Sequence, residues 1–128
     1  MNFVLDASAV LAALNDEPGA DRVADTLDDA VISAVNLAEV AAGLLRGGNR
    51  AIQVRAVLHA LGCNVIPVDE EMAIDAGLLR TVTDPAGLSL GDRFCLALAR
   101  RLDVPALTTD RQWLKVANAA DVTVELIR

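Results

Sequence analysis

The sequence predicts a single α/β domain over residues 1–128, with a central, mostly parallel sheet of about five strands flanked by helices. Short apolar runs alternate with helical patterns along the whole chain, which is typical of a helix-covered parallel sheet. The composition is 54% apolar but only 2% aromatic, so the core must consist of Ala, Leu and Val. A chain of 128 residues is long enough to bury such a core.

The strands are predicted at apolar runs that end in polar or turn-forming residues. Residues 3–5 are a continuous apolar run, as expected for a strand buried on both faces. Asp6 closes this run, at the carboxyl end of a strand that we expect to be central. The remaining strands are predicted at residues 30–33, 63–68, 105–108 and 122–127.

The first helices are predicted from small residues and from their start and stop signals. A small-residue helix follows the first strand directly, and Pro18 suits the first turn of the next, with Asn15 or Asp16 near its cap. Gly47 and Gly48 stop the helical pattern that begins at Val35. These helices are predicted at residues 7–14, 18–27 and 35–45.

The later helices are predicted from their caps. Asn49, Asp69 and Ser89 each precede a helical pattern and are residue types that cap helices. Residues 84–87, Asp-Pro-Ala-Gly, are predicted to form a loop. The helices are predicted at residues 50–61, 70–79, 90–102 and 111–116.

Charge and cysteine content exclude several classes of protein. The net charge of −7 argues against a sequence-independent polyanion binder, but not against an enzyme that gathers acids around a metal. Cys63 and Cys95 form neither a disulfide framework nor a metal knuckle, which favours a reducing cytoplasm. No apolar run has the length of a membrane span, and the N-terminus lacks the basic region of a signal peptide. We therefore expect a cytoplasmic protein without a membrane segment.

Four acidic residues differ from the others in their surroundings. Asp6 and Asp110 end predicted strands at the same edge of the sheet, where open α/β sheets bind ligands. Asp92 is in the first turn of its helix, and Glu39 lies in a nearly apolar stretch where an unpaired charge is costly. Asp6 alone is explained equally well as a helix cap. Together, four mutually repelling carboxylates predict a hard cation such as Mg²⁺ or Mn²⁺.

The chain resembles the PIN-domain ribonucleases, and specifically the VapC-type toxins of toxin–antitoxin modules. The resemblance rests on four pieces in the family's order and spacing: LDASA at residues 5–9, SAVNLAEV at 33–40, LSLGDR at 88–93 and LTTD at 107–110. Carried over position by position, it implies that the catalytic and metal-binding acids are Asp6, Glu39, Asp92 and Asp110. It further implies that Ser8 and Thr109 supply supporting hydroxyls.

The resemblance also implies an activity and partners. It implies an Mg²⁺- or Mn²⁺-dependent endoribonuclease that hydrolyses structured transfer or ribosomal RNA and so inhibits translation and growth. A VapB-type antitoxin would neutralise it, with residues 35–61 as the candidate groove and Arg46, Arg50 and Arg55 at its rim. The excess of apolar residues also predicts a homodimer.

Other residues near the acids have two interpretations each. Arg93, Arg111 and Lys115 follow the acids in sequence and suit either RNA phosphates or salt bridges on a solvated face. Trp113 suits either base stacking or a hydrophobic core position, and the core position is favoured. His59 is predicted to be an ordinary surface residue, and Cys95 a core residue.

Three other functions compete with the ribonuclease. A small-molecule phosphohydrolase with Asp6 as nucleophile would need a second acid two residues later, where this chain has Ser8. A phosphate-receiver domain would need an acidic pair after the first strand and an Asp at the end of the third. A non-catalytic protein-binding module is compatible with the fold, but leaves Glu39 in an apolar helix without a reason.

Overall fold

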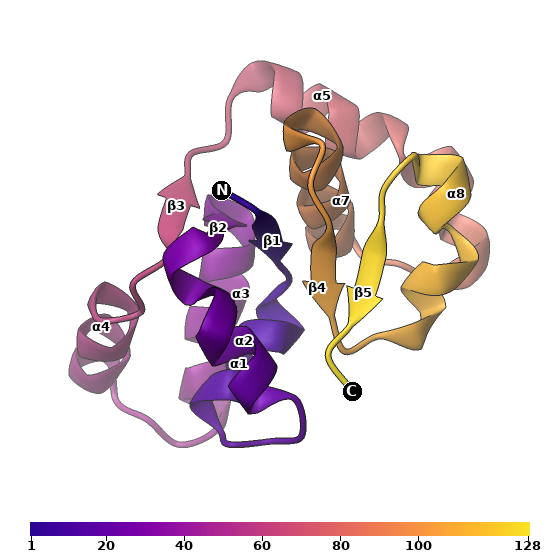
Figure 1. Ribbon diagram of the computed structural model, residues 1–128. Helices are drawn as coiled ribbons and strands as arrows, with labels where there is room; N and C mark the ends of the chain where they lie inside the picture. Colours follow the sequence, from indigo (N-terminus) through magenta and orange to yellow (C-terminus); the bar gives the residue numbers. More distant parts are fainter.

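A computed structural model describes residues 1–128 and shows a five-stranded sheet in the order β3-β2-β1-β4-β5, as Figure 1 shows. All four strand pairs are parallel, so the predicted fold class is confirmed. β1 and β4 lie side by side in the middle of the sheet, although a hundred residues separate them in sequence. The strands are β1 (Phe3–Leu5), β2 (Ala30–Ser33), β3 (Asn64–Ile66), β4 (Ala106–Thr108) and β5 (Val124–Leu126).

Each predicted helical interval contains a helix or 3₁₀ turn, and two further short helices lie outside these intervals. The α-helices are α1 (Ala7–Leu14), α2 (Ala20–Thr26), α3 (Ala34–Arg46), α4 (Ala51–His59), α5 (Glu70–Leu78), α6 (Arg80–Thr83), α7 (Leu90–Leu102) and α8 (Ala117–Ala120). The 3₁₀ turns are η1 (Leu27–Asp29), η2 (Asp84–Ala86) and η3 (Arg111–Lys115). No helix is both long and apolar enough to cross a membrane.

The two faces of the sheet bury alternate residues of the strands. Val4 faces one apolar core together with α5, α7 and the region around Trp113. Leu5, the next residue, faces a second core with α1, α2, α3 and α4. This period of two with helices on both faces explains why residues 3–5 are all apolar.

Several helix boundaries differ from the predictions for local reasons. Neither Asn15 nor Asp16 caps α2, because Gly19 occupies the N-cap in the left-handed region, with φ of 95°. Asn49 does not cap α4 either, since Arg50 holds that position and the Asn49 amide donates to the Leu44 carbonyl at the end of α3. The loop predicted at residues 84–87 contains the turn η2, and the short helices α6 and α8 were not predicted.

Candidate functional site

The four predicted site acids all lie at the carboxyl edge of the sheet. Asp6 follows β1 directly, and Asp110 follows β4 after one intervening residue. Glu39 lies in α3, which begins where β2 ends, and Asp92 lies in the first turn of α7. α3 packs against α7, so two helices and two strand ends bring these carboxylates to one region.

Asp6 occupies the N-cap position of α1, yet its carboxylate accepts no N–H of that helix. Its Oδ2 instead accepts hydrogen bonds from Ser8 Oγ at 2.6 Å and from Thr108 Oγ1 at 2.9 Å. Asp6 is only 4% exposed. The capping interpretation of Asp6 is therefore wrong, and its burial needs another reason.

Two hydroxyls, those of Ser8 and Thr108, donate to the Asp6 carboxylate. Thr109 donates its backbone N–H to Ser8 Oγ at 3.1 Å, and the role of its hydroxyl stays a prediction. The strand register explains the difference. β1 and β4 align Leu5 with Leu107, so the next pair along the strands is Asp6 and Thr108.

Glu39 is held by two residues that the sequence analysis left without a role. The Asn36 side-chain amide donates to Glu39 Oε1 at 2.8 Å and to the Gly91 carbonyl at 3.0 Å. A Cβ built on Gly91 would lie 2.2 Å from Glu39 Oε2, so the carboxylate fills the space that a side chain there would take. Both residues stand inside the two family-like motifs, which is the one signal that pointed to them.

Asp92 and Asp110 each combine their place at the site with a capping role. Asp92 and Ser89 form a capping box, in which Asp92 Oδ2 accepts the Ser89 backbone N–H at 2.9 Å. Asp110 Oδ1 accepts the Gln112 N–H at 2.9 Å and so begins η3. These bonds fix the orientation of both carboxylates.

The electrostatics show that the four acids interact. Burial is the main cause that raises the pKa of Asp6 to about 6, and the charges of Asp92 and Glu39 raise it further against the hydrogen bonds of Ser8 and Thr108. Burial, and then the charge of Asp110, also raises the pKa of Asp92. The site is therefore short of positive charge.

The carboxylates fit an open cation site rather than a closed cage. No three His, Cys, Asp or Glu side chains converge closely enough to hold an ion between them. However, each of the four carboxylates uses one oxygen for protein hydrogen bonds and leaves the other without a protein partner. None of these free oxygens is a fully buried, unpartnered atom, so each keeps some exposed surface. Mg²⁺ is typically bound by one or two carboxylates and completes its shell with water, which this donor set fits.

The sequence matches the PIN domain family over residues 3–119. The chain belongs to the PIN-domain family. No curated protein sequence matches this PIN domain. Its fold is similar to a DNA-bound VapBC from Salmonella typhimurium, with a TM-score of 0.75 and 18% identity over 100% of this chain and 99% of that one.

Two further VapC-type structures show the same fold. VapBC2 from Rickettsia felis, bound to a promoter DNA fragment, has a TM-score of 0.73 and 19% identity over 98% of each chain. VapC20 from Mycobacterium tuberculosis, described as a toxin that cleaves the sarcin–ricin loop, has a TM-score of 0.69 and 16% identity over 86% of this chain and 91% of that one. The likeness extends to the fold of the whole domain.

Basic residues of this PIN domain flank the acids unequally. The Arg93 side chain is only 12% exposed and pairs with Asp84 at 3.5 Å, so it faces the protein rather than solvent. Arg111 and Lys115 are exposed on η3, directly after Asp110. Of these three residues, only Arg111 and Lys115 are exposed and form no salt bridge.

The remaining predicted residues have structural positions. Trp113 is fully buried in the first apolar core, so it does not stack on a base. His59 is exposed at the end of α4. Cys95 is buried, and burial followed by the nearby site carboxylates raises the pKa of its thiol.

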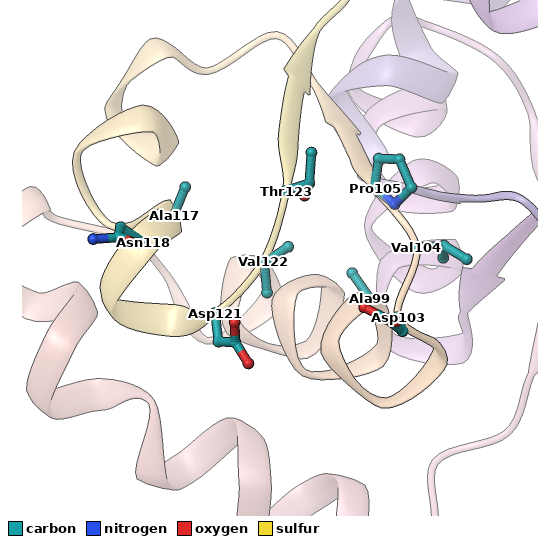
Figure 2. A pocket seen from close by; sticks show the side chains of 9 residues that line it. All are labelled: Ala99, Asp103, Val104, Pro105, Ala117, Asn118, Asp121, Val122 and Thr123. Atoms are coloured by element: carbon teal, nitrogen blue, oxygen red, sulfur yellow. The ribbon is translucent and has the colours of Figure 1, made fainter.

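A cavity of about 250 Å³ lies at the opposite, amino edge of the sheet (Figure 2). It is lined by the residues that lead into β4 and β5, among them Asp103 and Asp121, which both have positive φ at helix ends. None of the four site acids lines it. This cavity is thus separate from the acidic site.

Proposed function

We propose that this PIN domain is an Mg²⁺- or Mn²⁺-dependent endoribonuclease that acts as the toxin of a toxin–antitoxin pair. The observation that carries the proposal is the set of four carboxylates around Asp6, each anchored through one oxygen and open at the other. A buried Asp whose pKa is raised, and which does not cap its helix, is explained by a cation that offsets its charge.

Each group of site residues would have a separate role in RNA hydrolysis. Asp6, Glu39, Asp92 and Asp110 would hold the ion through their free oxygens. A bound Mg²⁺ or Mn²⁺ lowers the pKa of a coordinated water and offsets the charge that develops on the phosphate. Ser8 and Thr108 orient the Asp6 carboxylate, and the exposed Arg111 and Lys115 are placed to contact the RNA backbone beside Asp110.

The alternative functions are less well supported. An aspartyl nucleophile at Asp6 would lack a second acid at residue 8, where Ser8 donates a hydrogen bond to Asp6 instead. A non-catalytic binding module gives no reason to bury a carboxylate beside two others, since this raises its pKa and costs stability.

Structured RNA, such as transfer or ribosomal RNA, is the proposed substrate class. A protein with a net charge of −7 is poorly suited to hold random single strands through its surface charge. Recognition then depends on shape around a small basic patch, which a folded RNA offers. The VapC20 structure, a similar fold, is that of a toxin that cleaves the sarcin–ricin loop.

Cleavage of a total RNA pool tests the nuclease. With millimolar Mn²⁺ we expect a small set of discrete new 5′ ends, and none with chelator. Asp6→Asn protein prepared in the same way is the control for a contaminating nuclease. Uniform degradation, or equal cleavage by the variant, would overturn the proposal.

The proposed antitoxin partner would dock on the α3–α4 hairpin. Leu45 and Ile52 are 51% and 71% exposed there, and Arg46, Arg50 and Arg55 are exposed around them. This surface suits an amphipathic acidic segment. The similar Salmonella and Rickettsia proteins were crystallised as VapBC assemblies.

Apolar side chains exposed on α5, Ile74 and Leu78, support the proposed homodimer.

Growth assays test the partner proposal. Expression of the protein alone should arrest growth, and the Ile52→Glu variant should still arrest it while escaping an antitoxin that silences the parent. Normal growth with a folded, soluble parent would contradict the toxin role.

A further inference from the structure

Gly91 and Asn36 together fix the position of the Glu39 carboxylate. Gly91 is buried in the first turn of α7, next to Asp92, and faces α3. Both the main chain of Gly91 and the absence of a side chain there affect the position of Glu39. The carbonyl is bridged to the carboxylate by the Asn36 amide, and the vacant Cβ position is filled by the carboxylate itself.

The geometry leaves little freedom at this point. A Cβ on Gly91 would lie 2.2, 2.5 and 2.6 Å from Oε2, Cδ and Oε1 of Glu39. Real Cβ atoms essentially never approach another atom that closely, so the carboxylate would have to move. Because it is the far end of a flexible side chain, the move is possible without unfolding either helix.

Asn36 is buried for a reason other than stability. It is 0% exposed, and its Oδ1 has no hydrogen-bond partner, which costs free energy. Its amide nitrogen, however, donates to Glu39 Oε1 and leaves Oε2 free. A rotated amide would put an oxygen against two acceptors, so only this orientation is compatible with the site.

We propose that Gly91 and Asn36 are positioning residues that aim Glu39 Oε2 at the cation site by holding its carboxylate against α7. This inference rests on the proposed metal-dependent nuclease. The glycine is required for the absence of its side chain rather than for its backbone, since its φ is not in the left-handed region. Asp92 is the next residue, so the same turn of α7 sets the spacing of two site acids.

Gly91→Ala separates this role from a structural one. We expect an unchanged or higher Tm in chelator, because alanine favours a helix over glycine. Mn²⁺ affinity, measured by calorimetry and by the Mn²⁺-induced rise in Tm, should fall by about 10- to 100-fold, as should RNA cleavage. Gly77→Ala is the matched control, since a Cβ there meets nothing within 4 Å. Gly77→Ala should change neither Mn²⁺ affinity nor RNA cleavage.

A double-mutant cycle tests whether the effect of Gly91→Ala on Mn²⁺ affinity acts through the Glu39 carboxylate. In a Glu39→Gln background, Gly91→Ala should cause no further loss of Mn²⁺ affinity, because the carboxylate that it displaces is already gone. Asn36→Leu, which removes the donor but fills the space, should weaken Mn²⁺ binding in the parent and not in Glu39→Gln.

Failure of the inference and of the nuclease proposal are distinguishable. If the parent binds Mn²⁺ and cleaves RNA, and Gly91→Ala matches it, the positioning role is wrong. An equal loss with and without Glu39 would also overturn it, since the effect would then pass through the backbone. A parent that neither binds Mn²⁺ nor cleaves RNA would overturn the nuclease proposal and this inference together.

Discussion

Asp6 and Asp69 stand at the same place relative to a helix, but their surroundings are opposite. Asp69 caps α5 by accepting the Met72 N–H at 2.7 Å, and Arg101 forms two hydrogen bonds with its carboxylate. The Arg101 guanidinium and the capped N–H lower the pKa of Asp69. Asp6 caps nothing, has no cationic neighbour among its contacts, and has a raised pKa.

The difference separates an acid whose charge stabilises the fold from one whose charge destabilises it. The negative charge of Asp69 is stabilised by its helix and by an arginine, so ionisation favours the folded state. The negative charge of Asp6 is buried beside two other acids, so ionisation of Asp6 disfavours the folded state. We expect a functional acid to be one whose charge lacks a partner in the protein, and Asp6 meets this criterion.

The largest expected difference between these two regions is in activity. Replacing Asp6, Glu39, Asp92 or Asp110 by its amide should lower RNA cleavage by about 10³-fold or more, because each loses a charge at the ion. The amides at residues 92 and 110 can still accept the N–H groups that these residues cap. Asp69→Asn should cleave like the parent. Single-turnover rates with one structured RNA provide the measurement, and a full-rate Asp6→Asn would break the comparison.

The pH dependence of stability is the next effect in size. Between pH 3.8 and about 6 the folded protein keeps a proton on Asp6 that the unfolded chain has released. The free energy of unfolding should therefore fall as pH rises through this window, by an amount on the order of 3 kcal/mol. Urea melts of parent and Asp6→Asn from pH 4 to 7, in chelator, give this difference. Parallel curves for the two proteins would show that Asp6 ionises without cost.

At pH 8 in chelator, Asp6→Asn should be more stable than the parent by about 1 to 2 kcal/mol, because the buried charge is gone while Ser8 and Thr108 retain an acceptor. Millimolar Mn²⁺ should narrow this gap, since it stabilises the parent by ligand linkage. Thermal melts of both proteins with and without Mn²⁺ provide the test. A variant several degrees less stable than the parent in chelator would mean that Asp6 is structural.

The smallest expected effect belongs to Asp69. Asp69→Ala removes an exposed cap and an exposed ion pair, so we expect a small decrease in Tm. Because the site is elsewhere, the decrease should be the same with and without Mn²⁺. A change in the Mn²⁺ response would indicate that Asp69 is coupled to the site.

Local signals were enough to predict the sheet and the caps of α5 and α7. The apolar run 3–5 and the caps Asp69 and Ser89 match the structure because strand burial and N-caps depend on nearby residues. The cap of α2 was predicted wrongly because the left-handed Gly19 lies against Ile127 near the other end of the chain, a contact that no local pattern shows.

The support around the acids depended on distant pairings. Thr108 rather than Thr109 reaches Asp6 because of the register of β1 on β4, which the sequence does not display. Gly91 and Asn36 act across the contact of α7 with α3, so their role appears only when the two helices are brought together. The motifs were enough to predict that four acids lie at one edge of the sheet, but not how their carboxylates are held.

Anomalous diffraction from crystals soaked in Mn²⁺ tests the central claim most directly. We expect one or two manganese peaks at the carboxyl edge of the sheet, with a first ion about 2.1 Å from Asp6 Oδ1 and from at least one other free carboxylate oxygen of the four acids. The same soak of Asp6→Asn crystals should lack that peak. Manganese only in the amino-edge cavity beside Asp103 and Asp121, or none at millimolar concentration, would contradict a metal-dependent site built on Asp6.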